Sequence, residues 1–450
     1  MGPPRSNTTK KPSKDQHACD KKDKKKPQQP VRRGKLLLTE PAETNLINLS
    51  ATIPVTLQQL LLNVFRAALL DDTYVGPRSA NNATTDPNES VTSPEPRELD
   101  IKTLIQTLKS HLYNRDFDSA FTDASEELLR AYALRWSAAR ALGYAGVFKS
   151  VLKVLLKQDG LISSTGSNYV VCIGGGAGAE IIALAAAWRD LIDETDRGEM
   201  LSAGVAGVSL DESGGQVSTD TASKPARHPA LSVTAVDIAD WSGVVDRLTH
   251  TIRSPAVPGS KSHPAPLLRL EKGRDEREGE DDAGFAVRFS RSDVLSMSED
   301  DLRDLLHLET PGKVSSNSTV MVTLMFTLNE LFSTSMAKTT AFLLRTTDLL
   351  QPGTVLLVVD SPGSYSTLKL GKGKAQEGAG SSTIQERQYP MKFLLDHTLL
   401  SVAEGKWERI YSQDSRWWRR DASRVGYDVG EGSGLEDMRY QVHIYRRLAA

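Results

Sequence analysis

The sequence predicts an α/β fold: a doubly wound sheet of seven strands with an antiparallel last strand, preceded by a helical layer and a disordered basic N-terminal tail. From residue 168, short β-branched runs alternate with helical stretches, which is typical of a doubly wound sheet. The first five runs are almost entirely apolar, as expected for parallel strands covered on both faces. The last two alternate apolar and polar residues and are joined by the glycine-rich "GYDVGEGSGLED", which predicts an antiparallel pair at the sheet edge.

The N-terminal tail, residues 1–40, has few large apolar residues and many charges. Its first 35 residues hold twelve Lys or Arg against three Asp. Such a segment buries too little apolar surface to offset the entropy of ordering, so it is expected to be disordered. The run "KKDKKKPQQPVRRGK" fits a nuclear or nucleolar address or an arm that lies on nucleic acid. A merely solubilising tail is the alternative.

Residues 41–160 are predicted to form a helical N-terminal region. Apolar residues recur at helical spacing over 53–70 and again over 101–157, where two or three helices are expected. Between them, residues 71–99 are rich in Pro, Asn, Ser and Thr and are predicted to be a polar surface insertion.

Residues 161–450 are predicted to form the sheet domain. Its seven expected strands lie at 169–173, 231–236, 285–290, 319–326, 354–359, 408–412 and 438–445. Three stretches near 197–230, 254–283 and 366–388 interrupt the pattern and are predicted to be solvated loop insertions.

The composition argues against several classes of protein. The two cysteines, Cys19 and Cys172, supply neither a disulfide framework nor a thiolate metal site, and the eight histidines are scattered. We therefore expect no metal and a reducing, intracellular compartment. No run of about 18 apolar residues is present, so no membrane span is expected.

A glycine-rich turn is the strongest candidate for chemistry. In "VVCIGGGAGAE" Gly174, Gly175, Gly176 and Gly178 follow the first predicted strand and open a helix. Glycines let the backbone approach a ligand closely, and a helix N-terminus offers free N–H groups. Ligands of open α/β sheets bind at this edge. The alternative is a tight packing corner.

Two acids follow the next strands. Asp237 stands directly after the second strand, where a carboxylate can accept hydrogen bonds from both ribose hydroxyls of an adenosine; alternatively it caps the following helix. Asp293, beyond the third strand, is a candidate to accept a hydrogen bond from an adenine amino group, or a turn or cap residue.

This three-part pattern, over residues 168–447, resembles the class I S-adenosylmethionine (SAM)-dependent methyltransferases, whose first motif is acid-x-G-x-G-x-G. The closing antiparallel hairpin matches that family and disfavours the dehydrogenases, whose sixth strand is normally parallel. One departure is that Cys172 stands where the acid is usual. The contact of that acid with the methionine amino group therefore needs a backbone carbonyl or another side chain.

Further segments narrow the resemblance. "YNRDFDSAFTDASEELLRAYALRWSAARALGY", "MFTLNELF", "YPMKFLLDHTLL" and "DSRWWRR" together look like the fungal methyltransferases that modify N3 of a uridine in large-subunit ribosomal RNA. The resemblance implies SAM as the cofactor, ribosomal RNA or a pre-60S particle as the partner, and a nuclear or nucleolar location, with the cytoplasm as a further site. We expect a monomer. A methyltransferase for proteins or small molecules and a non-catalytic ribosome-assembly factor are the alternatives.

The segment after the fourth strand is expected to face the transferred methyl group. Thr327, Asn329 and Glu330 are candidate catalytic residues: Asn329 to hydrogen-bond an imide oxygen of the uracil and Glu330 to accept its proton. Alternatively, Asn329 simply caps a helix. Phe326, directly before them, is assigned to the cofactor site. Asp360, after the fifth strand, is a second acid near the same cleft, or a turn residue.

A late cationic and aromatic cluster is the candidate RNA-binding surface. Arg416, Trp417, Trp418 and Arg419 combine groups that stack on bases with groups that hold phosphates. Tryptophans in a late strand are often core residues instead. The upstream helix "RWSAARALGY" is predicted to pack over the cofactor pocket.

Overall fold

A computed structural model of the chain describes residues 47–70, 99–157, 162, 167–206, 228–269, 284–308, 318–363, 365–370 and 385–449. The predicted basic tail at 1–40 and all but the last residue of the polar insertion at 71–99 lie outside these ranges. Thr44–Ala450 form one compact unit. None of the described helices is both long and apolar enough to cross a membrane.

The main sheet has seven strands, as the sequence predicts. They are β1 (Ser167–Ile173), β2 (Ala230–Asp237), β3 (Phe285–Arg291), β4 (Ser318–Met325), β5 (Val355–Asp360), β8 (Trp407–Trp418) and β9 (Met438–Arg447). Their order is β3-β2-β1-β4-β5-β9-β8. The first five are parallel, and β9 runs antiparallel to both β5 and β8. The antiparallel closing pair is therefore confirmed.

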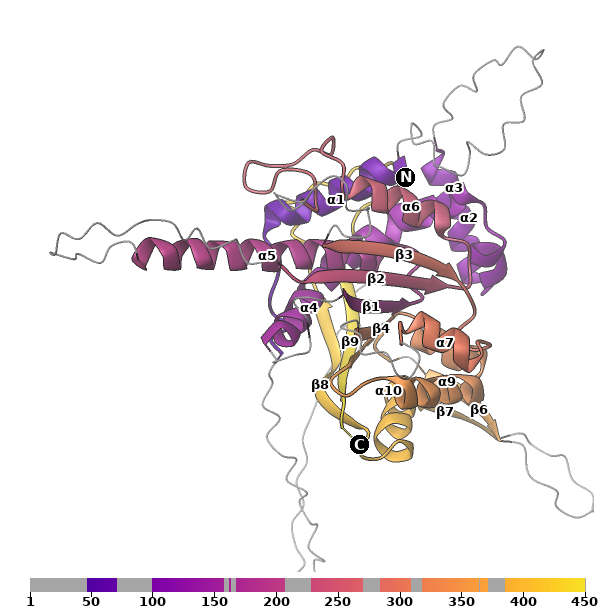
Figure 1. Ribbon diagram of the computed structural model, residues 1–450. Helices are drawn as coiled ribbons and strands as arrows, with labels where there is room; N and C mark the ends of the chain where they lie inside the picture. The colour runs from indigo at the N-terminus through magenta and orange to yellow at the C-terminus, as the bar shows by residue number, and fades with distance from the viewer. Residues whose placement is uncertain are drawn as a thin grey trace, which may run out of the picture. The chain divides into compact units, whose positions relative to one another are not determined.

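Two hydrophobic cores cover the two faces of the sheet, and alternate residues of β1 supply both. Val170 and Cys172 lie in the core beneath one helical layer, whereas Val171 and Ile173 lie in the other. Figure 1 shows α1 and α6 on one side of the sheet and α7 and α9 on the other. The apolar run from Val170 to Ile173 is the consequence of this double covering. The covering helices are α6 (Ser242–Thr251), α7 (Glu299–Leu305), α8 (Leu328–Thr334), α9 (Met336–Leu349), α10 (Met391–Asp396) and the short η5 (His397–Val402).

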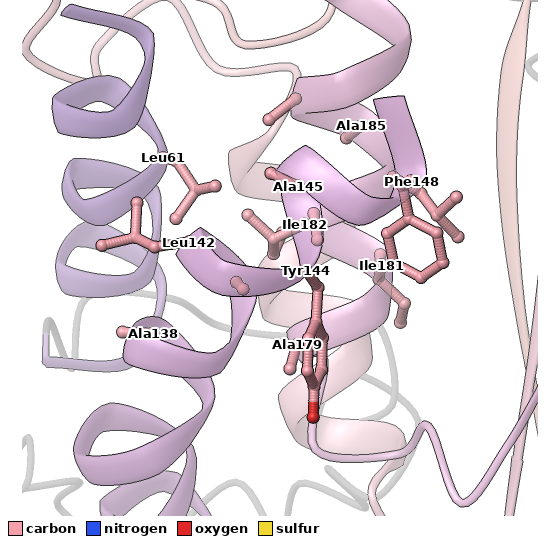
Figure 2. Close-up of a cluster of buried hydrophobic side chains, with 14 of the residues drawn as sticks. Leu61, Ala138, Leu142, Tyr144, Ala145, Phe148, Ala179, Ile181, Ile182 and Ala185 are labelled. Atoms are coloured by element: carbon pink, nitrogen blue, oxygen red, sulfur yellow. The ribbon is translucent and has the colours of Figure 1, made fainter. Parts of the chain in front are cut away.

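The N-terminal helices pack on the first of these faces. They are α1 (Val55–Leu70), α2 (Ile101–Tyr113), η2 (Asp118–Thr122), α3 (Glu126–Tyr132), η3 (Ala133–Ser137) and α4 (Ala138–Lys157). Figure 2 shows Leu61 of α1, Leu142 and Ala145 of α4, and Ile182 of α5 converging in one buried cluster. The run "IIALAAAW" suits this contact, because small residues let α4 lie close against α5 (Ala179–Ala206).

Three predicted loops differ from the structure. Helix α5 continues to Ala206, so the first part of the stretch near 197–230 is helical. Residues 254–269 of the second stretch pack on the helices: His263 Nδ1 lies 2.6 Å from the hydroxyl of Thr56, and Leu267 is fully buried. The third stretch contributes β6 (Tyr365–Leu370) and β7 (Gln385–Pro390), an antiparallel pair separate from the main sheet. Polar composition did not distinguish these segments from solvated loops.

Candidate active site at the carboxyl edge of the sheet

The glycine turn lies where the strand order reverses, between β1 and β4. This is the position at which open α/β sheets bind ligands. The N–H of Gly174 donates to the carbonyl of Val236 at 2.8 Å, which ties the turn to β2. On its other side Gly174, with φ of +76°, is so close to Thr327 that a Cβ would collide with that side chain. The ends of β1, β2 and β4 therefore meet at this turn.

The protein's own packing accounts for the other glycines of the turn. A Cβ on Gly176 would collide with the Trp241 ring and lie 2.9 Å from the Cβ of Asp237. One on Gly178, whose φ is +82°, would collide with Leu248. The tight corner considered from the sequence is thus part of the structure, and it brings the turn against Asp237.

Asp237 ends β2 and faces the glycine turn. Its Oδ2 accepts a hydrogen bond from the N–H of Gly176 at 3.2 Å, and its Oδ1 accepts one from Ala239 at 3.3 Å. Burial raises the pKa of Asp237 to about 6, against the effect of these backbone N–H groups. The helix-cap alternative is wrong, because α6 begins at Ser242 and its N-cap is Trp241.

Asp293 lies in the turn after β3, next to the end of β2. Its carboxylate accepts from the N–H of Leu295 at 2.9 Å and from the hydroxyl of Ser296 at 2.8 Å. Asp293 therefore acts as a turn residue, which is one of the roles that the sequence allowed. Each carboxylate oxygen has a second lone pair, so they do not prevent a contact with a ligand.

Phe326 directly follows β4 and has a strained conformation at the same edge. Its φ of +59° is unusual for a residue with a bulky side chain and costs about 1 to 3 kcal/mol, a kind of strain that clusters at functional sites. The guanidinium of Arg140 lies 5.0 Å from the centre of its ring, and the ring of Tyr144 stacks at 6.4 Å. Arg140 and Tyr144 of the "RWSAARALGY" helix therefore pack against Phe326 at this edge of the sheet.

Thr327 and Asn329 stand at the start of α8. The N-cap of this helix is Thr327, so the alternative that Asn329 is the cap is wrong. Asp360 is buried at the end of β5 and accepts from the backbone N–H of Asn329 at 3.0 Å. This bond makes Asp360 a positioning residue for α8. The side-chain Oδ1 of Asn329 is buried and has no hydrogen-bond partner among the described residues.

Glu330 lies in the first turn of α8, and much of its surface is exposed. Surrounding protein atoms partly desolvate its carboxyl and raise its pKa, and the nearby positive charge of Arg115 opposes that rise. Arg115 has a φ of +56° and follows α2, so the N-terminal helical layer contributes to this side of the site. Sequence reasoning did not identify Arg115, because only the tertiary structure brings its charge near Glu330.

The predicted RNA-binding residues lie on β8 and just beyond it. Strand β8 runs from Trp407 to Trp418, longer than the predicted 408–412. Because β5 and β8 both pair antiparallel with β9, they run in the same direction. Asp360 pairs with Gln441 of β9, and Trp417 pairs with Arg439, nearer the start of that strand. The end of β8 therefore extends past the edge of the sheet that holds the glycine turn.

Of the predicted cluster, Trp417 and Arg419 face outward. Trp417 is 50% exposed, and the guanidinium of Arg419 lies 4.0 Å from the centre of its ring. Arg439 lies 5.9 Å from the same ring. Arg419 also forms a 2.6 Å ion pair with Asp437. An exposed indole beside two guanidinium groups is suited to stacking on a base.

Arg416 and Trp418 have structural contacts instead. The guanidinium of Arg416 donates to the carbonyl of Leu49 at 2.7 Å and so attaches β8 to the segment before α1. Trp418 packs against the first core, where a Cβ on Gly143 would touch its ring. The core-residue alternative thus describes Trp418.

No group of His, Cys, Asp and Glu side chains in the described part of the chain is arranged to hold a metal ion. Cys172 is fully buried in β1, and burial raises the pKa of its thiol. A buried, protonated thiol cannot replace the carboxylate that the resemblance expects at this position.

Comparison with known proteins identifies the family. Residues 86–446 match the model of a family described as SAM-dependent methyltransferase. A 25S rRNA (uridine(2843)-N(3))-methyltransferase of Saccharomyces cerevisiae is 30% identical over 393 residues, which cover 86% of this chain and 85% of the relative.

Solved structures share only weak similarity with the chain. An O-methyltransferase family protein from Burkholderia thailandensis has 12% identity and a TM-score of 0.31, covering 78% of this chain and 71% of its own. A SAM-dependent methyltransferase from Methanosarcina mazei has 12% identity and a TM-score of 0.29, covering 64% and 95%. From the family match over most of its length, the chain belongs to the SAM-dependent methyltransferases.

Proposed function

We propose that this protein transfers a methyl group from SAM to N3 of a uridine in large-subunit ribosomal RNA. The observation that carries the proposal is the 30% identity, over 86% of the chain, to a yeast enzyme named for that reaction. The site supports it, because the glycine turn, the acid that ends β2 and the polar start of α8 meet at one edge of the sheet.

The residues at the glycine turn fit the cofactor. Gly174, Gly175, Gly176 and Gly178 present backbone beside Asp237, whose partly buried carboxylate suits the ribose hydroxyls of an adenosine. Asp293 stands next to it, for the adenine amino group. Phe326, held in its strained conformation, supplies an apolar surface. Bound SAM supplies a methyl group on a positively charged sulfur, which needs little activation beyond positioning.

The start of α8 is proposed to hold the uracil. Asn329 donates through its side-chain Nδ2 to an imide oxygen of the uracil, and the backbone bond to Asp360 fixes its position. Glu330 accepts the N3 proton, for which its raised pKa makes it a stronger base than an ordinary carboxylate. Thr327 packs against Gly174 and sets the spacing between the two halves of the site.

We further propose that Trp417 and Arg419 contact the RNA around the target, while Arg416 and Trp418 support the strand that carries them. The basic composition of residues 1–40 fits a nuclear or nucleolar protein that meets ribosomal RNA or a pre-60S particle, with the cytoplasm as a further site. We also propose that the protein acts as a monomer.

Nucleoside mapping tests the function. The gene is deleted, and N3-methyluridine in large-subunit ribosomal RNA is quantified by mass spectrometry with and without a plasmid that restores wild-type protein or Glu330→Gln. The proposal predicts loss of one modified uridine, recovery with wild type and no recovery with the variant. An unchanged N3-methyluridine level would overturn it. Recovery by the variant would indicate that Glu330 is not the base.

A further inference from the structure

Glu180 is a buried carboxyl that no part of the function above uses. It lies in the first turn of α5, two residues after the last glycine of the turn, and is 3% exposed. Its Oε1 has no hydrogen-bond partner among the described residues. A buried carboxyl oxygen without a partner destabilises a folded protein, so its presence at a binding turn calls for a functional explanation.

The charged and titratable groups around Glu180 come from three other elements. Arg140 and Tyr144 approach from α4, Asp237 from the end of β2, and Cys172 from β1. Figure 2 shows Tyr144 and Ala179, which begins α5, as members of one buried cluster. Only Arg140 is a cation, and its guanidinium hydrogen-bonds to the hydroxyl of Tyr132 at 2.9 Å. No direct ion pair between Arg140 and Glu180 is found within the described residues, so the guanidinium is open to a carboxylate. Burial keeps the Glu180 carboxyl protonated at neutral pH, and a cation placed beside it would lower its pKa and ionise it.

The chemistry of the site requires a pair of opposite charges. The methionine part of SAM carries an ammonium and a carboxylate on one carbon. In this chain Cys172 stands where related enzymes place the acid for the ammonium, and its buried thiol is held in the neutral form. Glu180 lies close enough to Cys172 for their charges to interact, and it is an acid on the same turn.

We propose that Glu180 binds the ammonium group of the cofactor in place of the missing acid, and that Arg140 of the helical layer binds its carboxylate. The proposal rests on the cofactor site described above, and it names the residues that bind the methionine end of SAM. It also gives the N-terminal helices a direct part in cofactor binding, since Arg140 comes from α4.

Calorimetric titration of the full-length protein with three ligands tests this pairing. S-adenosylhomocysteine carries both charges, its deaminated analogue lacks only the ammonium, and 5′-methylthioadenosine lacks both. Glu180→Gln keeps the shape of the side chain and removes its charge. It should weaken S-adenosylhomocysteine binding about 10- to 100-fold, as expected for a charge-assisted hydrogen bond, and leave the other two ligands unaffected.

Arg140→Gln is the matched variant. It should weaken S-adenosylhomocysteine and the deaminated analogue by similar factors, because both keep the carboxylate, and leave 5′-methylthioadenosine unaffected. If Glu180→Gln binds S-adenosylhomocysteine as wild type does, or loses affinity for all three ligands equally, the pairing is wrong while the cofactor site stands. If wild-type protein binds none of the ligands, the cofactor site itself is wrong.

Discussion

The backbone N–H of Gly176 donates a 3.2 Å hydrogen bond to Oδ2 of Asp237, although 61 positions separate the two residues in the chain. This bond links the turn after β1 to the end of β2 and holds the acid beside the glycines. In the proposed function the same carboxylate receives the ribose hydroxyls of the cofactor. The hydrogen bond therefore serves both the packing of the turn and the positioning of Asp237 for cofactor binding.

Asp237→Ala should weaken S-adenosylhomocysteine binding about 10- to 100-fold, because it removes a charged hydrogen-bond acceptor worth about 1.5 to 3 kcal/mol. Titration calorimetry measures the affinity, and thermal unfolding checks that the variant is folded. Asp237→Asn, which keeps one acceptor oxygen, should lose less. Wild-type affinity in a folded Asp237→Ala variant would remove Asp237 from the site.

Gly176→Ala should abolish cofactor binding and lower the melting temperature, because the new Cβ would collide with Trp241 and crowd Asp237. Gly198→Ala in α5 is the matched control, since nothing lies within 4 Å of the added Cβ. Alanine is favoured over glycine in helices by about 1 kcal/mol, so the control should be slightly stabilised. Equal effects of the two substitutions would show that the turn is not tightly packed.

The stability of the ligand-free protein should depend on the ionisation of Glu180. Burial raises the pKa of Glu180 from 4.5 to about 8, so between these values the folded state holds a proton that the unfolded state has released. The free energy of unfolding should therefore fall as pH rises from about 5 to 8, by at most about 1.4 kcal/mol per pH unit from this group.

Glu180→Gln should remove this contribution and make the protein more stable than wild type at pH 8, with the difference shrinking toward pH 5. Denaturant unfolding at several pH values measures it. Asp237 contributes a slope of the same sign between about pH 4 and 6, which the variant keeps. A variant that is less stable than wild type at pH 8 would contradict the claim that ionisation of the buried Glu180 carboxyl destabilises the folded protein.

Glu330→Gln should reduce the rate of methyl transfer about 10²- to 10⁴-fold and leave S-adenosylhomocysteine affinity unchanged, since loss of a general base affects the chemical step. In the wild type the rate should rise with pH through the raised pKa of Glu330, because only the deprotonated carboxylate accepts a proton. Asp360→Asn is expected to lower the rate less, through the position of Asn329. A full rate with Glu330→Gln would assign the proton to another acceptor.

Trp417→Ala should weaken RNA binding by about 1 to 3 kcal/mol, the range measured for base–aromatic stacking, with little effect on stability because the ring is half-exposed. Trp418→Ala is the contrasting variant: it should lower the melting temperature, because that ring packs on the core. Filter binding to a ribosomal RNA fragment and thermal unfolding separate the two. Equal RNA affinity of Trp417→Ala and wild type would remove β8 from the interface.

The sheet could be predicted from the sequence because strands that are buried on both faces have apolar residues at most positions. Strand β5 and the second half of β1 are apolar at nearly every position. Strand β9 alternates apolar and polar residues in sequence but is buried at nearly every position, because it lies between β5 and β8. Predictions from polarity were weaker. Residues 254–269 are polar and proline-rich, yet they pack on the helices through backbone carbonyls, three of which accept from the guanidinium of Arg189. The amino-acid composition of a segment does not indicate which of its backbone carbonyls will accept hydrogen bonds from a buried arginine.

The same limit applies within the site. Gly174 and Asp237 could be identified because strand ends gather at one edge of a parallel sheet. Glu180 could not, since in sequence it is an ordinary acid in the first turn of a helix, where acids are common. Its significance comes from burial between α4, β1 and β2, which depends on how the N-terminal helices close over the sheet.

The central claim is methyl transfer from SAM to N3 of a ribosomal uridine. The most direct test incubates the purified full-length protein with SAM carrying an isotopically labelled methyl group and with large-subunit ribosomal RNA from the deletion strain, followed by mass spectrometry of the digested nucleosides. The account predicts labelled N3-methyluridine at one position, absent with Glu330→Gln. Label in a protein, a small molecule or another base, or no transfer by wild-type protein that binds SAM, would contradict it.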